Sequence, residues 1–342
     1  MGCSAAAFLA EAGARVELFE SGELAGAASG RNSGSIQHPF DPVLAELHGE
    51  TLRHYRELED FELSDTPAGV LVVAREREAI EAVAAEAAVD PLGPDELRHV
   101  EPGLASGLWG CRLETGYPVR PAAATLAFAR RAWRAGALLH KGRPAWPWVI
   151  GGRVRGVLAG GEQCAAGAVL VAAGPWPPEV IDPTGTWQPI VPVWGVVVDV
   201  LMEAPPSHVI EQAGVDEVGL GGASESLFSL VTADGVAAVG STFLAREPDP
   251  ATWAGKLRRA GQRFVPALER AKVDSARACA RPQSRDGRPL VGPVAGIEGL
   301  SVAAGHGPWG ISTGPATGRL TADALLGRAE VPAALAASRF EG

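Results

Sequence analysis

The first twenty residues constrain the fold more than any other stretch of the chain. Residues 2–12 are rich in alanine and leucine and stop at Gly13, and the apolar-alternating segment Arg15–Glu20 follows. This order predicts a helix, a glycine cap and a strand that ends in an acid. In a βαβ nucleotide-binding fold, a glycine opens such a helix so that a pyrophosphate can approach its first amides, and the acid accepts the ribose hydroxyls. Gly2 and Glu20 occupy those two positions.

The nucleotide-binding pattern is incomplete at its start. If Gly2 is the last glycine of GxGxxG, then the first glycine and the strand before it lie upstream of Met1, and Glu20 follows that first glycine by roughly 20 residues. The first strand is then missing, and its loss would leave the neighbouring strands unpaired. We therefore expect that the natural protein begins earlier and that Met1 is an internal start. Taken alone, the same residues also fit an ordinary helix and strand.

A loop of small and hydrogen-bonding residues follows, from Ala25 to Ser35. Its glycines allow a close approach of the backbone to a ligand, and Ser29, Arg31 and Asn32 can donate to phosphate or ring oxygens. Such a loop can lie against a phosphate. A merely flexible connection has the same composition, so this signal gains weight only together with others.

Length and charge restrict the classes of function. The chain has 342 residues and a formal net charge of −10. At roughly 150 residues a domain, the length predicts two domains and the size of an enzyme. The negative charge opposes the phosphates of nucleic acids and of anionic lipids, so we expect no nucleic-acid partner.

Cysteine spacing and hydropathy indicate a reduced, soluble protein. The four cysteines, at positions 3, 111, 164 and 279, show neither a CxxC pair nor metal-ligand spacing, so we expect free thiols and no metal. The longest apolar run is shorter than the roughly 20 residues of a membrane span. No basic segment of a signal peptide follows Met1. We expect a cytoplasmic protein without an integral membrane segment.

The rest of the chain predicts an α/β fold with an inserted second domain. Residues 168–174 form an unbroken apolar run, which fits a parallel strand covered on both faces, and residues 156–158 before it carry similar patterning. The β-branched segments 191–198 and 235–240 predict an antiparallel sheet. We expect a discontinuous nucleotide-binding domain and an α+β substrate domain. The first comprises residues 1–64, 118–186 and 283–342, and the second comprises residues 65–117 and 187–282.

Near the C-terminus, residues 280–293 and 300–318 complete a recognisable set of motifs. A strand runs into a glycine-rich turn that opens a helix, whose unpaired amides present a positive potential. With these residues the chain resembles the FAD-dependent D-amino-acid oxidase superfamily, in its glycine oxidase, sarcosine oxidase and D-amino-acid dehydrogenase branch. Five ordered motifs carry the resemblance: Glu20, residues 28–35, residues 171–176, residues 281–293 and residues 305–318.

The resemblance implies a Rossmann-like FAD-binding domain and the oxidation of a C–N bond. The substrate would be a small amine or amino acid, and a hydride would pass from its carbon to flavin N5, so no catalytic side chain is named. Arg281 matches the position that holds the substrate carboxylate in glycine oxidase-like members, with a surface ion pair as the alternative. His306 and His38 could line the substrate cavity or be structural. The residues implied to bind FAD are Gly2, Glu20, Ser29, Arg31, Asn32, Gly34, Ala173, Gly174, Gly305, Gly310 and Ile311.

The chain also departs from the family, which leaves alternatives open. It has only two tyrosines, Tyr55 and Tyr117, so a substrate site with several tyrosines is not available. Cys279 lies near the place where sarcosine oxidases carry a flavin-linking cysteine, but Arg281 favours noncovalent FAD. A FAD-dependent 2-hydroxy-acid dehydrogenase, or a cofactor-free, noncatalytic subunit, remains an alternative function. Homo- or hetero-oligomers are both compatible with the sequence.

Overall fold

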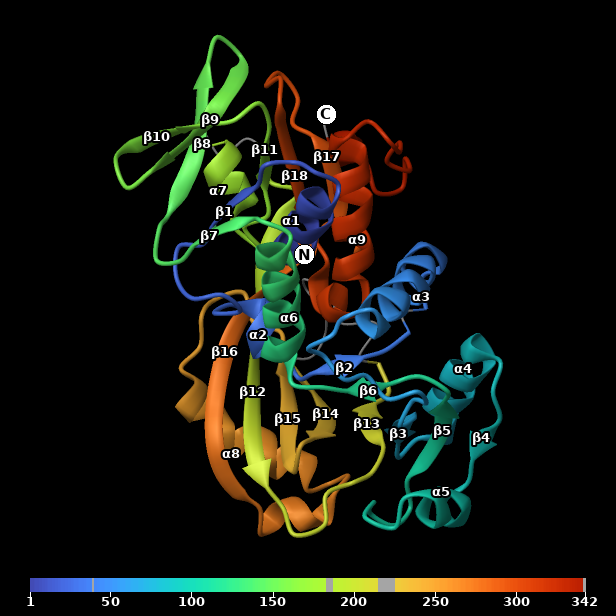
Figure 1. Cartoon of the computed structure of the whole chain (residues 1–342). Helices are drawn as coiled ribbons and strands as arrows, with labels where there is room; N and C mark the ends of the chain where they lie inside the picture. Colours follow the sequence, from blue (N-terminus) through green and yellow to red (C-terminus); the bar gives the residue numbers. More distant parts are fainter. Residues whose placement is uncertain (39, 183–186, 215–224, 341–342) are drawn as a thin grey trace.

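A mixed eight-stranded sheet forms the lower half of the molecule in Figure 1. The structure is a computed structural model that describes residues 1–38, 40–182, 187–214 and 225–340. The strands follow the order β16-β12-β15-β14-β13-β3-β5-β4, and all neighbours are antiparallel except β13 and β3. Their bounds are β3 (Val70–Ala74), β4 (Pro91–Leu92), β5 (Trp109–Leu113), β12 (Ile190–Leu201), β13 (Val209–Gln212), β14 (Ser226–Ala233), β15 (Val236–Thr242) and β16 (Lys272–Ser284).

The two faces of this large sheet have different neighbours. Helix α8 (Pro250–Gly261) and the 3-10 turn η1 (Pro266–Glu269) cover one face through a core that includes Phe228, Leu230 and Leu257. From the other face, Arg277 of β16 donates to the main-chain carbonyls of Arg31 and Asn32, at the end of α2 (Ala28–Arg31). Two further helices, α4 (Arg77–Ala87) and α5 (Pro94–Val100), pack near β5.

The upper half contains short parallel strands. Strand β1 (Glu17–Phe19) pairs in parallel with β7 (Leu138–His140), and β11 (Val169–Val171) pairs in parallel with β18 (Leu300–Ala304). Strand β17 (Leu290–Pro293) lies antiparallel to β18. The parallel strand predicted within residues 168–174 is therefore confirmed. Within the described residues, β1 pairs only with β7 and β11 only with β18.

Two small antiparallel sheets complete the strands. One consists of β8 (Ala145–Ile150), β9 (Arg153–Ala159) and β10 (Glu162–Ala165), and the other of β2 (Ser35–Ile36) and β6 (Tyr117–Pro118). Residues 156–158 therefore belong to an antiparallel meander, and the nucleotide-fold patterning predicted for them is wrong. Their glycine and β-branched composition fits either kind of strand.

Helix α1 (Gly2–Glu11) packs between α6 (Pro121–Arg134) and α9 (Gly310–Leu325), as Figure 1 shows. Its alanine-rich surface allows close packing, and at Gly318 of α9 an added Cβ would overlap with the Ser4 side chain. Helix α3 (Pro42–Arg56) lies against α9. The remaining helical segments are α7 (Pro177–Ile181), η2 (Gly307–Trp309) and η3 (Ala337–Phe340).

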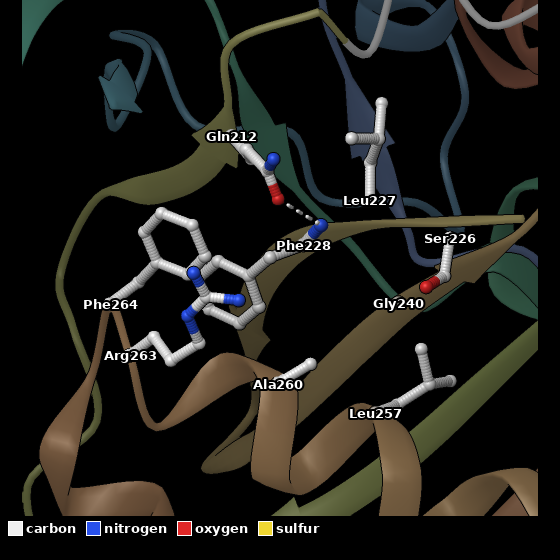
Figure 2. Close-up of a pocket in the computed structure, with 9 residues that line it drawn as sticks. All are labelled: Gln212, Ser226, Leu227, Phe228, Gly240, Leu257, Ala260, Arg263 and Phe264. Carbon is white, nitrogen blue, oxygen red and sulfur yellow. Dashed lines mark hydrogen bonds between the residues drawn. The ribbon is translucent and has the colours of Figure 1, made fainter. Parts of the chain in front are cut away.

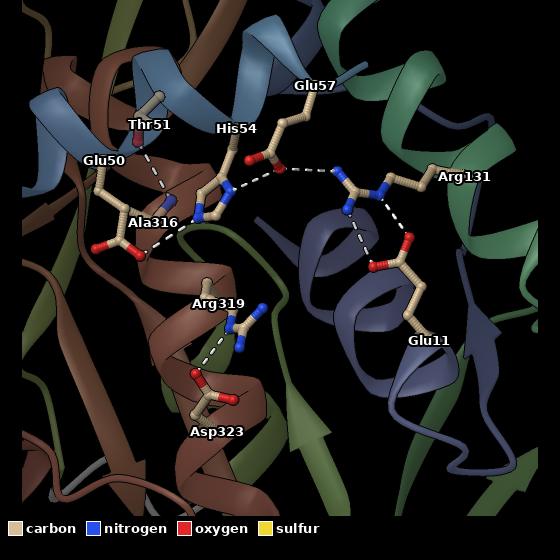
Figure 3. Close-up of polar contacts among 9 residues, drawn as sticks. All are labelled: Glu11, Glu50, Thr51, His54, Glu57, Arg131, Ala316, Arg319 and Asp323. Carbon is tan, nitrogen blue, oxygen red and sulfur yellow. Dashed lines mark hydrogen bonds and ion pairs between the residues drawn. The ribbon is translucent and has the colours of Figure 1, made fainter. Parts of the chain in front are cut away.

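Polar contacts join α1, α3 and α6 at their exposed ends, as Figure 3 shows. Arg131 of α6 donates to Glu11 of α1 at 2.6 Å and lies 3.7 Å from the carboxylate of Glu57. Glu57 in turn lies 3.5 Å from Nδ1 of His54 on α3. Such partly exposed pairs contribute little each, about 0–1 kcal/mol. The three helices are therefore held mainly by their apolar contacts.

The α/β fold with a Rossmann-like part and a second sheet is confirmed. The predicted antiparallel sheet is correct apart from the single parallel pair β13 and β3. The proposed domain boundaries remain a proposal, and their stretches 183–186 and 341–342 lie outside the described residues. No helix in the described part of the chain is long and apolar enough to cross a membrane.

Candidate functional site

The start of α1 lies between the end of β11 and helix α9. A Cβ added to Gly2 would lie 3.3 Å from the Cβ of Ala172, and one added to Gly314 of α9 would lie 3.8 Å from the Cβ of Met1. Ala173 and Gly174 lie two and three residues after the end of β11, and Gly174 has a φ of +62°. The first amides of a helix lack intrahelical partners, so this region is suited to an anionic group.

Glu20, which the sequence predicts to bind a ribose, lies immediately after β1. Its Oε1 accepts from the Gly22 amide at 2.8 Å and from the Ser21 hydroxyl at 3.2 Å. Within the described residues, Oε2 has no hydrogen-bond partner. The geometry thus fixes the carboxylate through one oxygen and leaves the other for hydroxyl donors.

The predicted phosphate loop is braced by its own side chains. Asn32 Nδ2 donates to the carbonyls of Ala28 and Ser29, and Asn32 Oδ1 accepts from the Gly34 amide at 2.9 Å. Arg31 donates from Nη1 to the Ala278 carbonyl at 3.3 Å. Asn32 is therefore occupied with closing the loop, while the Ser29 hydroxyl has no partner within the described residues. At Gly34, with φ +87°, an added Cβ would overlap with the Val119 carbonyl.

The turn before α9 brings a buried histidine beside the end of β16. Gly305 has a φ of +86°, and a Cβ there would lie 3.2 Å from the Ser284 Cβ. His306 is 4% exposed, and its Nε2 has no hydrogen-bond partner in the described part of the chain. Burial lowers the pKa of His306 to about 3, so its ring is neutral near pH 7. Gly310 and Ile311 begin α9, as predicted.

Arg281 lies in β16 on the face that carries Arg277. Its guanidinium donates to the Thr242 carbonyl at 2.9 Å and to the Ser241 hydroxyl, and it lies 4.7 Å from the centre of the Phe243 ring. No carboxylate forms an ion pair with it within the described residues. Burial lowers the pKa of Arg281, yet a guanidinium remains cationic. The site therefore holds a largely desolvated cation without a counter-ion, which favours an anionic ligand.

Several polar residues near the start of α9 were not predicted. The Gln37 amide donates to the Ser312 hydroxyl at 3.0 Å, and Gln37 Nε2 donates to Glu211 of β13 at 2.9 Å. Gln37 Oε1 is buried without a partner in the described part of the chain. A polar pair between β13 and the residue after β2 has no local sequence signal, because it depends on how distant strands align.

His38 and His48 form a pair of neighbouring histidine rings near Gln37. Their ring centres are 5.7 Å apart, and the His38 amide donates to the Thr115 hydroxyl at 2.8 Å. Burial lowers the pKa of both histidines, that of His48 to about 4. The His48 Nδ1 is buried and has no partner within the described residues. His38 therefore lies beside Gln37 and His48, whereas no direct contact joins it to Arg281 or His306.

The residues present fit a dinucleotide cofactor. Around the start of α9, five buried polar atoms lack protein partners among the described residues: Ser35 Oγ, Gln37 Oε1, His48 Nδ1, Ser284 Oγ and His306 Nε2. Leaving such atoms unpaired costs about 1–3 kcal/mol each. A ligand with a polar edge would satisfy them, while the start of α1 and Glu20 suit a pyrophosphate and a ribose. The roles of the individual predicted residues remain predictions.

Both tyrosines are buried in the protein core, and none of the four cysteines forms a disulfide. Tyr55 is buried, and its hydroxyl donates to the Ile311 carbonyl at 2.8 Å, while Tyr117 lies in the core beside α6. The four cysteines are free thiols, and Cys164 is only half-buried. Burial raises the pKa of Cys279, which disfavours its reactive thiolate. The described residues contain no cluster of three or more side chains that could hold a metal ion.

Comparisons with known proteins point to one family. A family model described as FAD dependent oxidoreductase matches residues 1–324. A glycine oxidase of Bacillus licheniformis is 26% identical over an alignment of 348 residues, which covers 96% of this chain and 90% of that protein. A D-amino acid dehydrogenase of Rhizobium johnstonii is 31% identical over 245 residues, 68% of this chain and 53% of that one. The crystal structure of glycine oxidase from Geobacillus kaustophilus has a TM-score of 0.82 at 25% identity, covering 96% of this chain and 93% of that one.

Proposed function

We propose that this chain, which belongs to the FAD-dependent oxidoreductase family, oxidises the C–N bond of an amino acid or of a secondary amine that carries a carboxylate. The similarity to proteins named glycine oxidase and D-amino acid dehydrogenase supports this substrate class. Bound FAD would supply the hydride acceptor, flavin N5. The substrate carbon loses a hydride and its nitrogen a proton, and water hydrolyses the resulting imine to an oxo compound with release of ammonia or of an amine.

The guanidinium of Arg281, which has no ion-pair partner among the described residues, carries the proposal. Its planar fork matches the two oxygens of a carboxylate, and bidentate pairs of this kind are both strong and directional. Ser241 and Thr242 hold the guanidinium from one side. We infer that Arg281 binds the substrate carboxylate and thereby orients the reacting C–N bond.

The chain's other residues would hold the cofactor and exclude water. The start of α1 would face the pyrophosphate and Glu20 the ribose, while the start of α9 would face the flavin ring. The residues that would do so are Gly2, Glu20, Ser29, Arg31, Asn32, Gly34, Ala173, Gly174, Gly305, Gly310 and Ile311. We propose noncovalent FAD, because burial keeps Cys279 protonated.

Neither His306 nor His48 is suited to act as a strong general base. The pKa values of about 3 for His306 and about 4 for His48 keep both rings neutral near pH 7 but weakly basic. We infer that they accept or donate a hydrogen bond to the ligand, and that the amine reacts as the free base.

The test compares substrates with and without a carboxylate. In Arg281→Met, loss of a charged hydrogen-bonded pair worth about 1.5–3 kcal/mol should raise the KM for glycine, sarcosine or D-alanine about 10- to 100-fold. The KM for the corresponding simple amines should not change, and Arg281→Lys should be intermediate. Arg285→Met, on the exposed end of the same segment, is the matched control, since the hydrogen bond of its side chain within the described residues goes to the Gln188 carbonyl.

Flavin absorbance of each purified variant distinguishes the outcomes. Wild-type and variant proteins should carry equal FAD, so that the change lies in substrate binding. An unchanged KM for amino acids in Arg281→Met contradicts the assignment. Faster turnover of lactate than of any amine would favour a 2-hydroxy-acid dehydrogenase instead, and wild-type protein that takes up no FAD would contradict the proposed function.

A further inference from the structure

We propose that the cavity between α8 and β13–β14 is a second binding site, which takes a small aromatic carboxylate. The cavity has a volume of about 250 Å³. Figure 2 shows the residues around it, which come from β13, β14 and β15, from α8 and from the residues just after α8. Six of them carry the argument: Gln212, Phe228, Gly240, Leu257, Arg263 and Phe264.

The apolar part of the cavity suits a planar ring. The rings of Phe228 and Phe264 are stacked and nearly parallel, with an interplanar angle of 1° and centres 5.0 Å apart. Leu257 contributes a buried aliphatic side chain beside them. A cavity of about 150 Å³ lined by similar side chains is sufficient for benzene. The larger volume here therefore accommodates a benzene ring with a short substituent.

The polar part of the cavity selects a negative charge. Arg263 is exposed, and within the described residues its guanidinium has neither an ion-pair nor a hydrogen-bond partner. Its main-chain carbonyl accepts from the guanidinium of Arg75 at 3.2 Å, so a second cation lies next to the Arg263 backbone. No aspartate or glutamate is among the described residues that line the cavity. A carboxylate is thus the complementary group.

Gln212 adds an oriented donor. Its Oε1 accepts from the Phe228 amide at 3.2 Å, as the dashed line in Figure 2 shows. This bond fixes the side-chain amide, and Gln212 Nε2 has no protein partner within the described residues. One neutral donor together with one guanidinium suits the two oxygens of a single carboxylate.

The cavity is separate from the Arg281 site, although the same strands serve both. On β13, Gln212 lines the cavity, while its neighbour Glu211 accepts from Gln37. On β15, Gly240 lines the cavity, while the next residue, Ser241, accepts from Arg281. The inference rests on the cavity's own side chains and does not depend on the proposed function.

The experiment measures binding of phenylacetate to the flavin-loaded protein by isothermal titration calorimetry. It is carried out in the Arg281→Met background, so that the proposed substrate site does not contribute. We expect one saturable site per chain. Adding Arg263→Met should weaken the affinity at least tenfold, and Ala260→Phe, which fills the cavity from an exposed helix position, should abolish binding. Arg259→Met, a neighbouring exposed arginine outside the lining, is the matched control and should have no effect.

A second probe separates ring binding from charge recognition. Phenylacetamide keeps the ring but lacks the charge, so its affinity should be at least tenfold lower than that of phenylacetate. Absence of saturable phenylacetate binding in the Arg281→Met protein would overturn the proposal. Equal affinities for Arg263→Met and Arg259→Met, or for the two probes, would do so as well. Equal melting temperatures of the variants establish that each has folded.

Discussion

At the scale of single residues, the position of Arg281 depends on a glycine in the neighbouring strand. Gly195 of β12 pairs with Cys279, and the Arg281 side chain lies over it. A Cβ at position 195 would lie 2.5 Å from Nη2 and 2.6 Å from Cζ of Arg281. Because the guanidinium is the end of a flexible side chain, an alanine would displace it and leave the strand intact.

Gly195→Ala should therefore affect substrate binding in the same way as a substitution of Arg281. We expect the KM for amino-acid substrates to rise about tenfold, the equivalent of about 1.4 kcal/mol, with little change in the KM for simple amines. In the Arg281→Met background, Gly195→Ala should add nothing, because the displaced group is already gone. Independent, additive effects in this double-mutant cycle would show that Gly195 does not position the guanidinium.

The residues of the candidate site differ in how well they could be predicted from the sequence. Glu20 stands in a motif whose spacing is local, and Arg281 stands in a motif that carries the family resemblance, so both could be named as candidates before the fold was known. A glycine inside the β-branched segment 191–198 is also a signal, since glycine within a strand often marks a close approach. By contrast, Gln37 and Glu211 meet only because β13 lies near the segment after β2. Strand alignment of this kind is set by tertiary packing.

At the scale of elements, α3 compensates for a proline inside α9. Pro315 has no amide hydrogen, so the Ile311 carbonyl one turn earlier lacks its usual intrahelical donor. The Tyr55 hydroxyl of α3 supplies one at 2.8 Å. The Thr51 hydroxyl accepts from the Ala316 amide at 3.2 Å, as Figure 3 shows. Two side chains of α3 thus satisfy polar groups around the break in the helix that begins at the proposed flavin site.

Tyr55→Phe should leave the Ile311 carbonyl buried without a donor. We expect a loss of about 1–3 kcal/mol in the free energy of unfolding, measured by urea denaturation. Adding Pro315→Ala should recover much of this loss, because the new amide can donate to Ile311. The same Pro315→Ala change in the wild-type background provides the control. If Pro315→Ala stabilises the wild type and Tyr55→Phe equally, the tyrosine hydroxyl does not replace the donor that the proline lacks.

Elements could be predicted where the pattern is local and strong. The helix at residues 2–12, the strand within 168–174 and the segments 191–198 and 235–240 all form, because their periodicity and flanking glycines agree with their environment. Residues 156–158 were placed in the wrong kind of sheet, since a short apolar segment does not reveal its partner strands. The parallel pairing of β13 with β3 could not be predicted for the same reason, because these strands are far apart in the sequence.

At the scale of the whole molecule, Arg277 links the large sheet to the loop of the proposed FAD site. Its Nε donates to the Arg31 carbonyl and its Nη2 to the Asn32 carbonyl, both at 3.0 Å. Its third nitrogen pairs with Asp199 of β12. The sheet therefore fixes the backbone of two residues implied to bind FAD, and cofactor binding should depend on a side chain that belongs to the other half of the molecule.

Arg277→Lys separates the charge of this side chain from its geometry. A lysine keeps the pairing with Asp199 but lacks the planar fork that reaches two carbonyls at once. Loss of two hydrogen bonds, at about 0.5–1.5 kcal/mol each, should raise the dissociation constant of FAD about tenfold. Flavin fluorescence after dilution of the holoenzyme measures the release. Arg285→Lys, which alters an exposed arginine bonded to one carbonyl, should retain FAD as the wild type does. Equal release from the two variants would mean that the loop holds its shape without the Arg277 side chain.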